Sequence, residues 1–422
     1  MRRALLAAAI LVPVGCAPEL GDAPFACGID GACPEGYGCR STVCVREGAE
    51  AVPARPARVT WINAAELHWV ARPEGGAALV VNDGFTPGAH GLYEIGVSPD
   101  GLVEPPRLLY PYGDELPISS SVVALDDERY AAAMLRFPRV DEDAMTLEVL
   151  AIARGAPEGA APGIETLYRE REPFLGGVEP SYIGAVTRAG AVHVAWTRPS
   201  LGGRVEVVRI ARSGSVWSKA GADTEPLPAG LLPLSGDCAL WPSGDDLVVR
   251  VGFEAFAVGT VGADGALSPL TPLTFATDVP LYAAGGELLL LRYGDYDDPT
   301  ASYPVSWARA DLAGQVLEEA PAGSIEAPLE LYSGTPYEGG ALIAPLPGDA
   351  ASPELSVGFW APGAPAPVRV ARVPRASRDD LYTARAFAAD GKVYLAWTEF
   401  HESQMDLWVA TADMDEAPGA SP

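Results

Sequence analysis

The sequence carries very little positive charge. It has 29 Lys plus Arg against 56 Asp plus Glu, so the formal net charge of the 422 residues is -27. Only Lys219 and Lys392 are lysines, and no run of basic residues is longer than two. A chain this acidic repels phosphate backbones and offers no basic patch. We therefore expect no nucleic acid partner.

Long apolar runs and helix-favouring composition are also missing. Beyond the N-terminus, no apolar segment approaches the roughly 20 residues that span a bilayer. The 46 glycines and 40 prolines disfavour long helices, which argues against a helical bundle or a coiled coil. The hydrophobic content of 48% is nevertheless too high for a disordered acidic chain. These features predict a folded protein rich in β-structure.

The N-terminus has the layout of an export signal. Arg2 and Arg3 precede a short apolar stretch at residues 4–12, which is too short to span a membrane. The stretch ends in Val-Pro-Val-Gly-Cys at residues 12–16, which resembles the lipobox of bacterial lipoproteins. That resemblance implies removal of residues 1–15 and acylation of Cys16, leaving residues 16–26 as a lipidated tether. The alternative is an ordinary cleaved signal with an incidental cysteine.

The predicted lipid anchor implies a place in the cell envelope. Two or three acyl chains hold a protein stably on a membrane, whereas one chain does not. Ala17 follows the cysteine, and in the lipoprotein sorting rule a residue other than Asp there favours the outer membrane. We therefore expect an outer-membrane or cell-surface protein that contacts the membrane through its N-terminal lipid.

A cluster of cysteines follows at residues 27–46. Turn-forming residues separate the cysteines and few apolar residues are present, so this segment cannot build a core of its own. In an exported protein two disulfides are the natural interpretation, and zinc is the alternative. All three pairings remain open for Cys27, Cys33, Cys39 and Cys44. The segment resembles the short cysteine modules of secreted bacterial proteins, and the Pro-containing residues 47–56 are expected to be a linker.

The remainder of the chain repeats itself. Val-His-Val-Ala-Trp-Thr-Arg at 192–198 reappears as Val-Tyr-Leu-Ala-Trp-Thr-Glu at 393–399, each time after a turn with glycine. Weaker copies follow turns near residues 76, 127, 244, 286 and 340. The spacing of about 52 residues, filled with short alternating strands, is typical of a propeller blade. We expect an all-β protein, a β-propeller of about seven four-stranded blades, with six or eight as alternatives.

The ends of the repeat region predict how the ring closes. The last repeat lacks a fourth strand, while the strand at residues 58–62 stands alone before the first repeat. Pairing of these two would remove two exposed edges. The propeller is therefore expected to cover residues 57–415, followed by a tail at 416–422.

The Gly-Lys-Val-Tyr-Leu-Ala-Trp-Thr pattern at 391–398 resembles the blades of sialidase-like propellers. Sialidases carry Asp boxes of the form Ser-x-Asp-x-Gly-x-x-Trp. The segments beginning at Ser98 and Ser213 match them incompletely, and no catalytic residue of that family can be assigned here.

Motifs for catalysis are absent from the sequence. No zinc-protease motif, nucleophile elbow, phosphate loop or dinucleotide fingerprint occurs. The four histidines are not spaced as metal ligands, and Cys238 has the surroundings of a buried apolar residue. Asp295 and Asp297 are candidate Ca²⁺ ligands because a hard cation prefers carboxylates, although a solvated loop explains them equally well. Apart from this Ca²⁺ candidate we expect no cofactor.

These observations favour a non-catalytic, monomeric, lipid-anchored envelope protein whose propeller face binds a protein or glycan partner. Propellers gather loops from every blade at the two ends of the channel, which makes such surfaces available. A glycan-directed hydrolase or lyase with its site in the funnel is the alternative, and a purely structural envelope protein is a third.

Overall fold

The computed structural model describes residues 25–26, 33–40, 43–46, 57–59, 64–83, 90–112, 117–136, 144–154, 162–173, 183–198, 203–228, 237–252, 255–273, 278–293, 303–325, 332–348, 354–375, 380–401 and 404–415. Within these ranges every regular element is a β-strand and none is a helix. Accordingly, no helix in the described ranges could cross a membrane.

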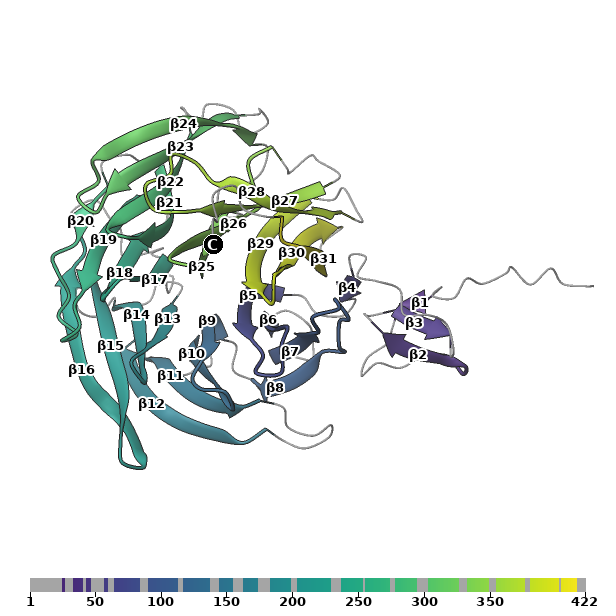
Figure 1. The fold of residues 1–422 in the computed structure, drawn as a ribbon. Helices are drawn as coiled ribbons and strands as arrows, with labels where there is room; N and C mark the ends of the chain where they lie inside the picture. The colour runs from purple at the N-terminus through teal and green to yellow at the C-terminus, as the bar shows by residue number, and fades with distance from the viewer. Residues whose placement is uncertain are drawn as a thin grey trace, which may run out of the picture.

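Seven antiparallel sheets of four strands each surround a central axis, so the chain is a seven-bladed propeller (Figure 1). Blade 1 contains β5 (Ala64–Ala71), β6 (Ala77–Asp83), β7 (Gly91–Val97) and β8 (Arg107–Pro111). Blade 2 contains β9 (Pro117–Ala124), β10 (Arg129–Arg136), β11 (Ala144–Ala153) and β12 (Ile164–Pro173). Blade 3 contains β13 (Gly184–Arg188), β14 (Ala191–Arg198), β15 (Arg204–Ser213) and β16 (Val216–Pro226).

The second half of the ring repeats the arrangement. Blade 4 contains β17 (Asp237–Ser243), β18 (Asp246–Gly252), β19 (Phe256–Val261) and β20 (Thr271–Pro272). Blade 5 contains β21 (Asp278–Ala284), β22 (Glu287–Tyr293), β23 (Tyr303–Asp311) and β24 (Val316–Ile325). Blade 6 contains β25 (Ser333–Tyr337), β26 (Gly340–Ala344), β27 (Glu354–Trp360) and β28 (Val368–Pro374). Blade 7 contains β29 (Asp380–Ala389), β30 (Lys392–His401), β31 (Gln404–Asp413) and β4 (Ala57–Val59).

The ring closes as the sequence predicts. β4 comes before blade 1 in the chain but pairs with β31 as the outermost strand of blade 7, with Val59 opposite Leu407. Arg58 reinforces this pairing with an ion pair of 2.6 Å to Asp406. The closure therefore joins residues 348 positions apart and leaves no open boundary between first and last blade.

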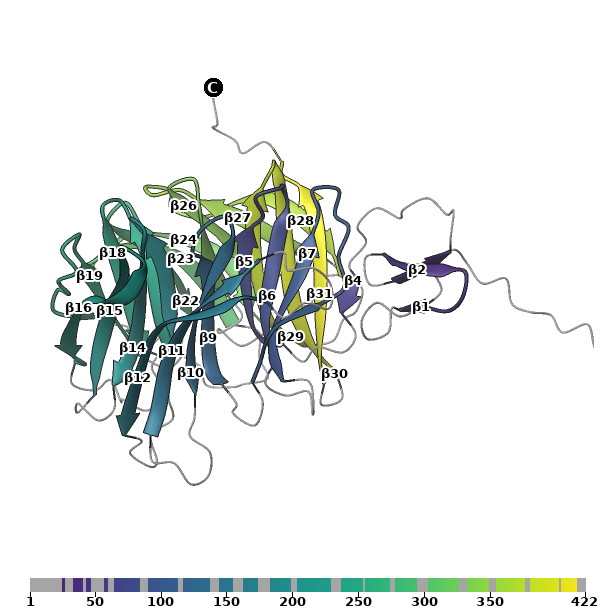
Figure 2. The same cartoon turned by 90° about the horizontal axis from the view of Figure 1, so that it is seen from below.

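The turns found in the sequence lie at one face of the ring, which we call the tight-turn face (Figure 2). It carries the turns that join the first and second strands of each blade. In blades 3, 6 and 7 these turns contain Ala189, Glu338 and Asp390 at positive φ, each followed by a glycine also at positive φ. Two successive positive φ values match the twist of a tight hairpin, which explains the recurring glycines.

The apolar core lies between adjacent blades. The repeated Trp196 and Trp397 are both 0% exposed, and each packs with the alternate aliphatic residues of its own strand. Tyr394 points to the other side of β30 and packs in a separate cluster that includes blade 1 residues. The Val, Leu and Trp residues of each strand therefore share one face, and the opposite face is buried as well.

Buried ion pairs also tie neighbouring blades together. Arg198 on β14 contacts Glu172 on β12 of the preceding blade at 2.5 Å and Glu206 on β15 at 2.9 Å. The indole nitrogen of Trp196 donates to the same Glu206 at 3.0 Å.

A separate three-stranded sheet precedes the propeller, in the order β1 (Phe25–Ala26), β3 (Val43–Arg46) and β2 (Tyr37–Arg40). A disulfide joins Cys33 to Cys44. This finding selects one of the three pairings left open by the sequence. Cys27 lies outside the described residues, so the second predicted disulfide stays a prediction.

Candidate functional site

The innermost strands β5, β9, β13, β17, β21, β25 and β29 surround the axis of the ring (Figure 1). Their contacts with the neighbouring blades differ around the ring. From blade 6 through blades 7, 1 and 2 to blade 3, which we call the polar half, side chains of the inner strands form hydrogen bonds to the next blade. In the other half, glycines bring the inner strands of blades 3 and 4 and of blades 5 and 6 into close contact. Arg188 and Arg250 also donate there to backbone carbonyls of the next blade.

Glu66 on β5 is the central acceptor of the polar half. Its Oε1 accepts a hydrogen bond from the Ser119 hydroxyl at 2.9 Å. Its Oε2 accepts from the Ser120 hydroxyl and backbone N–H, both at 2.6 Å, and from the Asn82 amide at 2.9 Å. Burial nevertheless raises the pKa of Glu66, and the hydrogen bonds only partly offset this effect. The carboxyl group thus joins blade 1 to blade 2 and has its lone pairs engaged by neighbouring groups.

His68 and Ser120 lie close together but do not form a nucleophile and base. The Ser120 Oγ lies 3.3 Å from His68 Nε2, and its proton is donated to Glu66. Nε2 must then be the protonated nitrogen that donates to the serine oxygen. A nucleophilic serine needs the opposite arrangement, in which the imidazole accepts the hydroxyl proton. Burial and the nearby positive charge of Arg385 lower the pKa of His68 to about 3, so the ring is neutral near pH 7.

The polar network continues in both directions around the channel. On one side the Ser119 hydroxyl accepts a hydrogen bond from the backbone N–H of Ile183 in blade 3 at 3.1 Å. On the other side the Trp69 indole donates to the carbonyl of Arg385 in blade 7 at 2.8 Å. The Ser333 hydroxyl of blade 6 donates to the carbonyl of Ala384 at 3.2 Å. These polar side chains therefore serve to hold blades together.

Tyr112 donates a hydrogen bond to the side-chain amide oxygen of Asn82, the residue whose amide nitrogen donates to Glu66, at 2.9 Å. Burial first, and then the charge of Glu66, raise the pKa of Tyr112, with Asp83 adding a smaller contribution of the same sign. A tyrosine nucleophile needs the reverse shift. Tyr112 is 4% exposed and Asp83 is 0% exposed, so neither is open to a substrate.

In the other half of the ring, glycines allow the inner strands to touch. A Cβ on Gly334 would lie 2.8 Å from the Leu281 carbonyl oxygen and 2.8 Å from the Tyr282 Cβ. A Cβ on Gly184 would lie 2.9 Å from backbone atoms of Cys238 and Ala239. These contacts are backbone contacts between adjacent blades, so a side chain there has nowhere to move.

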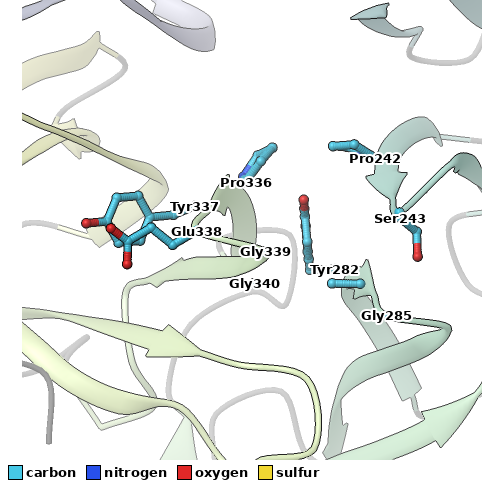
Figure 3. A pocket seen from close by; sticks show the side chains of 11 residues that line it. Pro242, Ser243, Tyr282, Gly285, Pro336, Tyr337, Glu338, Gly339 and Gly340 are labelled. Carbon is cyan, nitrogen blue, oxygen red and sulfur yellow. The ribbon is translucent and has the colours of Figure 1, made fainter. Parts of the chain in front are cut away.

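A pocket of about 320 Å³ opens among the first turns of blades 4, 5 and 6 on the tight-turn face (Figure 3). Its lining includes prolines, turn glycines, two tyrosines and one acid, and among the lining residues there is no Lys, Arg or His: Pro242, Ser243, Gly244, Tyr282, Ala284, Gly285, Pro336, Tyr337, Glu338, Gly339 and Gly340.

Tyr282 is the polar group at the centre of this pocket. It is 2% exposed, its ring packs 5.8 Å from that of Trp241, and its hydroxyl points between Pro242 and Pro336 (Figure 3). Within the part of the chain that the structure describes, this hydroxyl is not one of the buried polar atoms without a partner, which agrees with its facing the open pocket. Burial raises the pKa of Tyr282 well above its ordinary value, so the phenol stays neutral.

The sequence-predicted site residues are only partly placed. Cys16, Asp295 and Asp297 lie outside the described residues, so lipidation and Ca²⁺ binding stay predictions. In the described ranges no three His, Cys, Asp or Glu side chains gather as a metal site. Cys238 lies on β17 and is 4% exposed, which agrees with its expected buried position.

Sequence reasoning missed both Glu66 and Tyr282. Glu66 and His68 occupy alternate positions of the same inner strand, so their side chains lie on the same face. This pair of polar residues on the first strand of a blade could have predicted a polar contact there. Tyr282 carried no such signal, because its role comes from the turns of two other blades.

Comparisons with known proteins give fold-level matches only. No protein-family profile and no curated protein matches the chain. Among solved structures, the Trypanosoma rangeli sialidase is 12% identical with a TM-score of 0.46, and the match covers 87% of this chain and 54% of the sialidase chain. The chain therefore spans about half the length of that sialidase.

Two further solved structures match at equally low identity and low TM-score. The alpha-L-arabinofuranosidase of Fusarium graminearum in complex with arabinobiose is 12% identical with a TM-score of 0.39, covering 70% of this chain and 93% of that one. The WD40 domain of SCAP from fission yeast is 12% identical with a TM-score of 0.36, covering 85% and 98%. The similarity to sialidase-like propellers is thus weak, and the fold assignment rests on the seven observed sheets.

Proposed function

We propose that this protein is a non-catalytic, lipid-anchored component of the cell envelope whose propeller face binds a protein or glycan partner. The proposal rests on the hydrogen bonds that the Glu66 carboxyl group accepts. Its carboxyl oxygens receive four hydrogen bonds from Ser119, Ser120 and Asn82, so this carboxyl on the innermost strand of blade 1 acts as a structural link between blades.

A hydrolase in the same channel would need groups with the opposite properties. Glycoside hydrolysis uses two accessible carboxyl groups, roughly 5 to 10 Å apart, or a comparable nucleophile. Asp83 and Tyr112 lie near Glu66 and are both closed off from solvent, and the nearby His68 has a lowered pKa and is neutral near pH 7. This arrangement supports binding over chemistry.

The anchoring part of the proposal rests on the sequence. Acylated Cys16 would hold the chain at the outer membrane or cell surface, and the cysteine module with the linker at 47–56 would separate the propeller from the lipid. We further propose that the protein acts as a monomer without nucleic acid, and without a cofactor apart from the candidate Ca²⁺ at Asp295 and Asp297.

The test is to incubate the full chain, held in detergent, with a broad glycan library and to follow the glycan masses over time. Unchanged masses, together with retention of particular glycans or of a purified envelope protein on the immobilised chain, are the expected result. New glycan fragments would contradict the proposal and identify a glycan-directed hydrolase or lyase. A Glu66→Gln variant would then show whether this carboxyl is responsible.

A further inference from the structure

The pocket on the tight-turn face has a tyrosine hydroxyl in its wall that a ligand could contact. Tyr282 is 2% exposed as a whole residue, and its hydroxyl points into the pocket. The hydroxyl is not among the buried polar atoms that lack a partner in the described ranges, so it is open to solvent or to a ligand. A phenol hydroxyl can both donate and accept a hydrogen bond. The pocket therefore offers one hydrogen-bonding group to a ligand.

The pocket's size limits what can enter. A volume of about 320 Å³ lies at the lower end of ligand sites, which range from roughly 300 to 1,000 Å³. The walls on either side of the Tyr282 hydroxyl are the rings of Pro242 and Pro336 (Figure 3). The space suits a single extended group with an apolar stem and a polar end.

The charges around the pocket indicate whether the polar end of such a group is cationic or anionic. The lining includes no cationic side chain, and Glu338 stands on the rim beside Tyr337, on the side away from Tyr282 (Figure 3). The whole chain has a formal net charge of -27, which repels anions and attracts cations over long distances. A neutral Tyr282 hydroxyl can accept a hydrogen bond from a cationic donor.

We propose that this pocket receives an arginine side chain from a basic segment of a partner protein. The methylene stem packs between Pro242 and Pro336, the guanidinium donates to the Tyr282 hydroxyl, and the Glu338 carboxylate attracts the charge from the rim. This inference rests on the proposed binding function and deepens it, because it names the face and the partner chemistry.

The test uses N-acetyl-arginine methylamide as the probe, with the neutral N-acetyl-glutamine methylamide as its comparison. Binding to the full chain is followed by saturation-transfer NMR at millimolar probe concentration. We expect signal at the arginine methylene protons, little for glutamine, and weakening at high salt. The Tyr282→Phe variant, which keeps the ring packing, should bind about threefold to tenfold more weakly, as loss of one hydrogen bond predicts.

Glu338→Gln should weaken binding by a smaller factor and reduce its salt dependence, whereas Glu165→Gln, an exposed residue of blade 2, is the matched control and should change nothing. No arginine signal, equal signals for the two probes, or unchanged binding by Tyr282→Phe would each overturn the inference. These outcomes are separate from the glycan test. Unchanged glycan masses without arginine binding would reject the pocket assignment and leave the binding function in place.

Discussion

Arg375 and Glu399 form an ion pair of 2.9 Å in which both side chains are 1% exposed. Arg375 follows β28 at the outside of blade 6, while Glu399 lies on β30 of blade 7. The Trp397 indole donates to the same carboxylate oxygen at 3.1 Å. In blade 3 the equivalent Trp196 also donates to a buried glutamate that is paired with an arginine. The repeated Trp therefore marks a buried polar link in both copies.

Removing one member of this pair should destabilise the propeller strongly. In Glu399→Ala the Arg375 guanidinium stays buried but loses this ion pair, which costs about 3 to 5 kcal/mol. We expect a correspondingly lower denaturant midpoint for this variant. Glu354→Ala is the control, because its pair with Arg372 is 3.5 Å long and half exposed on both sides, and exposed pairs contribute about 0 to 1 kcal/mol. Equal effects of the two substitutions would contradict this account.

The close approach of blades 5 and 6 makes Gly334 intolerant of a side chain. The new Cβ of Gly334→Ala would press on the Leu281 carbonyl and on Tyr282, and such overpacking costs about 1 to 3 kcal/mol. Gly221 on β16 has no atom within 4 Å of the corresponding position, so Gly221→Ala should leave stability unchanged or slightly higher. Urea unfolding of both variants measures the contrast, and a neutral Gly334→Ala would show that the inner strands can separate.

The buried His68 should make the propeller sensitive to acid. Its folded pKa is lowered from 6.5 to about 3, so its contribution to stability is complete above pH 6.5 and is lost as the pH falls towards 3. The difference in unfolding free energy between wild type and His68→Gln should shrink by up to about 1.4 kcal/mol per pH unit in that window. Glu66 has a raised pKa and acts in the opposite sense, but it is present in both proteins. Parallel pH curves for the two proteins would exclude His68 as the titrating group.

The pairing of Cys33 with Cys44 constrains the rest of the cysteine module. If the module has two disulfides, the second can only join Cys27 to Cys39. Mass spectrometry of an unreduced digest should recover both linked peptides. A free thiol at Cys39 would instead favour a single bridge, and zinc bound by the reduced cysteines would contradict both disulfides.

Cys16 should carry the lipid that anchors the chain. Expression of Cys16→Ser in a bacterial host should abolish incorporation of labelled fatty acid and move the protein out of the membrane fraction. Cys238→Ser is the control, because Cys238 is buried in β17 and should leave labelling unchanged. Labelling that persists in Cys16→Ser would refute lipidation at this position.

Sequence patterns were enough to predict the blade repeat, the alternation within strands and the closing role of the strand before blade 1. Each of these depends on local signals, namely glycine-containing turns and a period of two, which a short segment carries without its neighbours. The Trp196 and Trp397 repeats were therefore recognisable at once.

The contacts between polar or small residues of different blades could be seen only in the folded ring. Glu66 accepts from serines more than 50 positions away, and Arg375 reaches Glu399 across a blade boundary. The pocket around Tyr282 exists only because turns of three blades converge. Such contacts depend on how the sheets are placed around the axis, and no single strand encodes that placement.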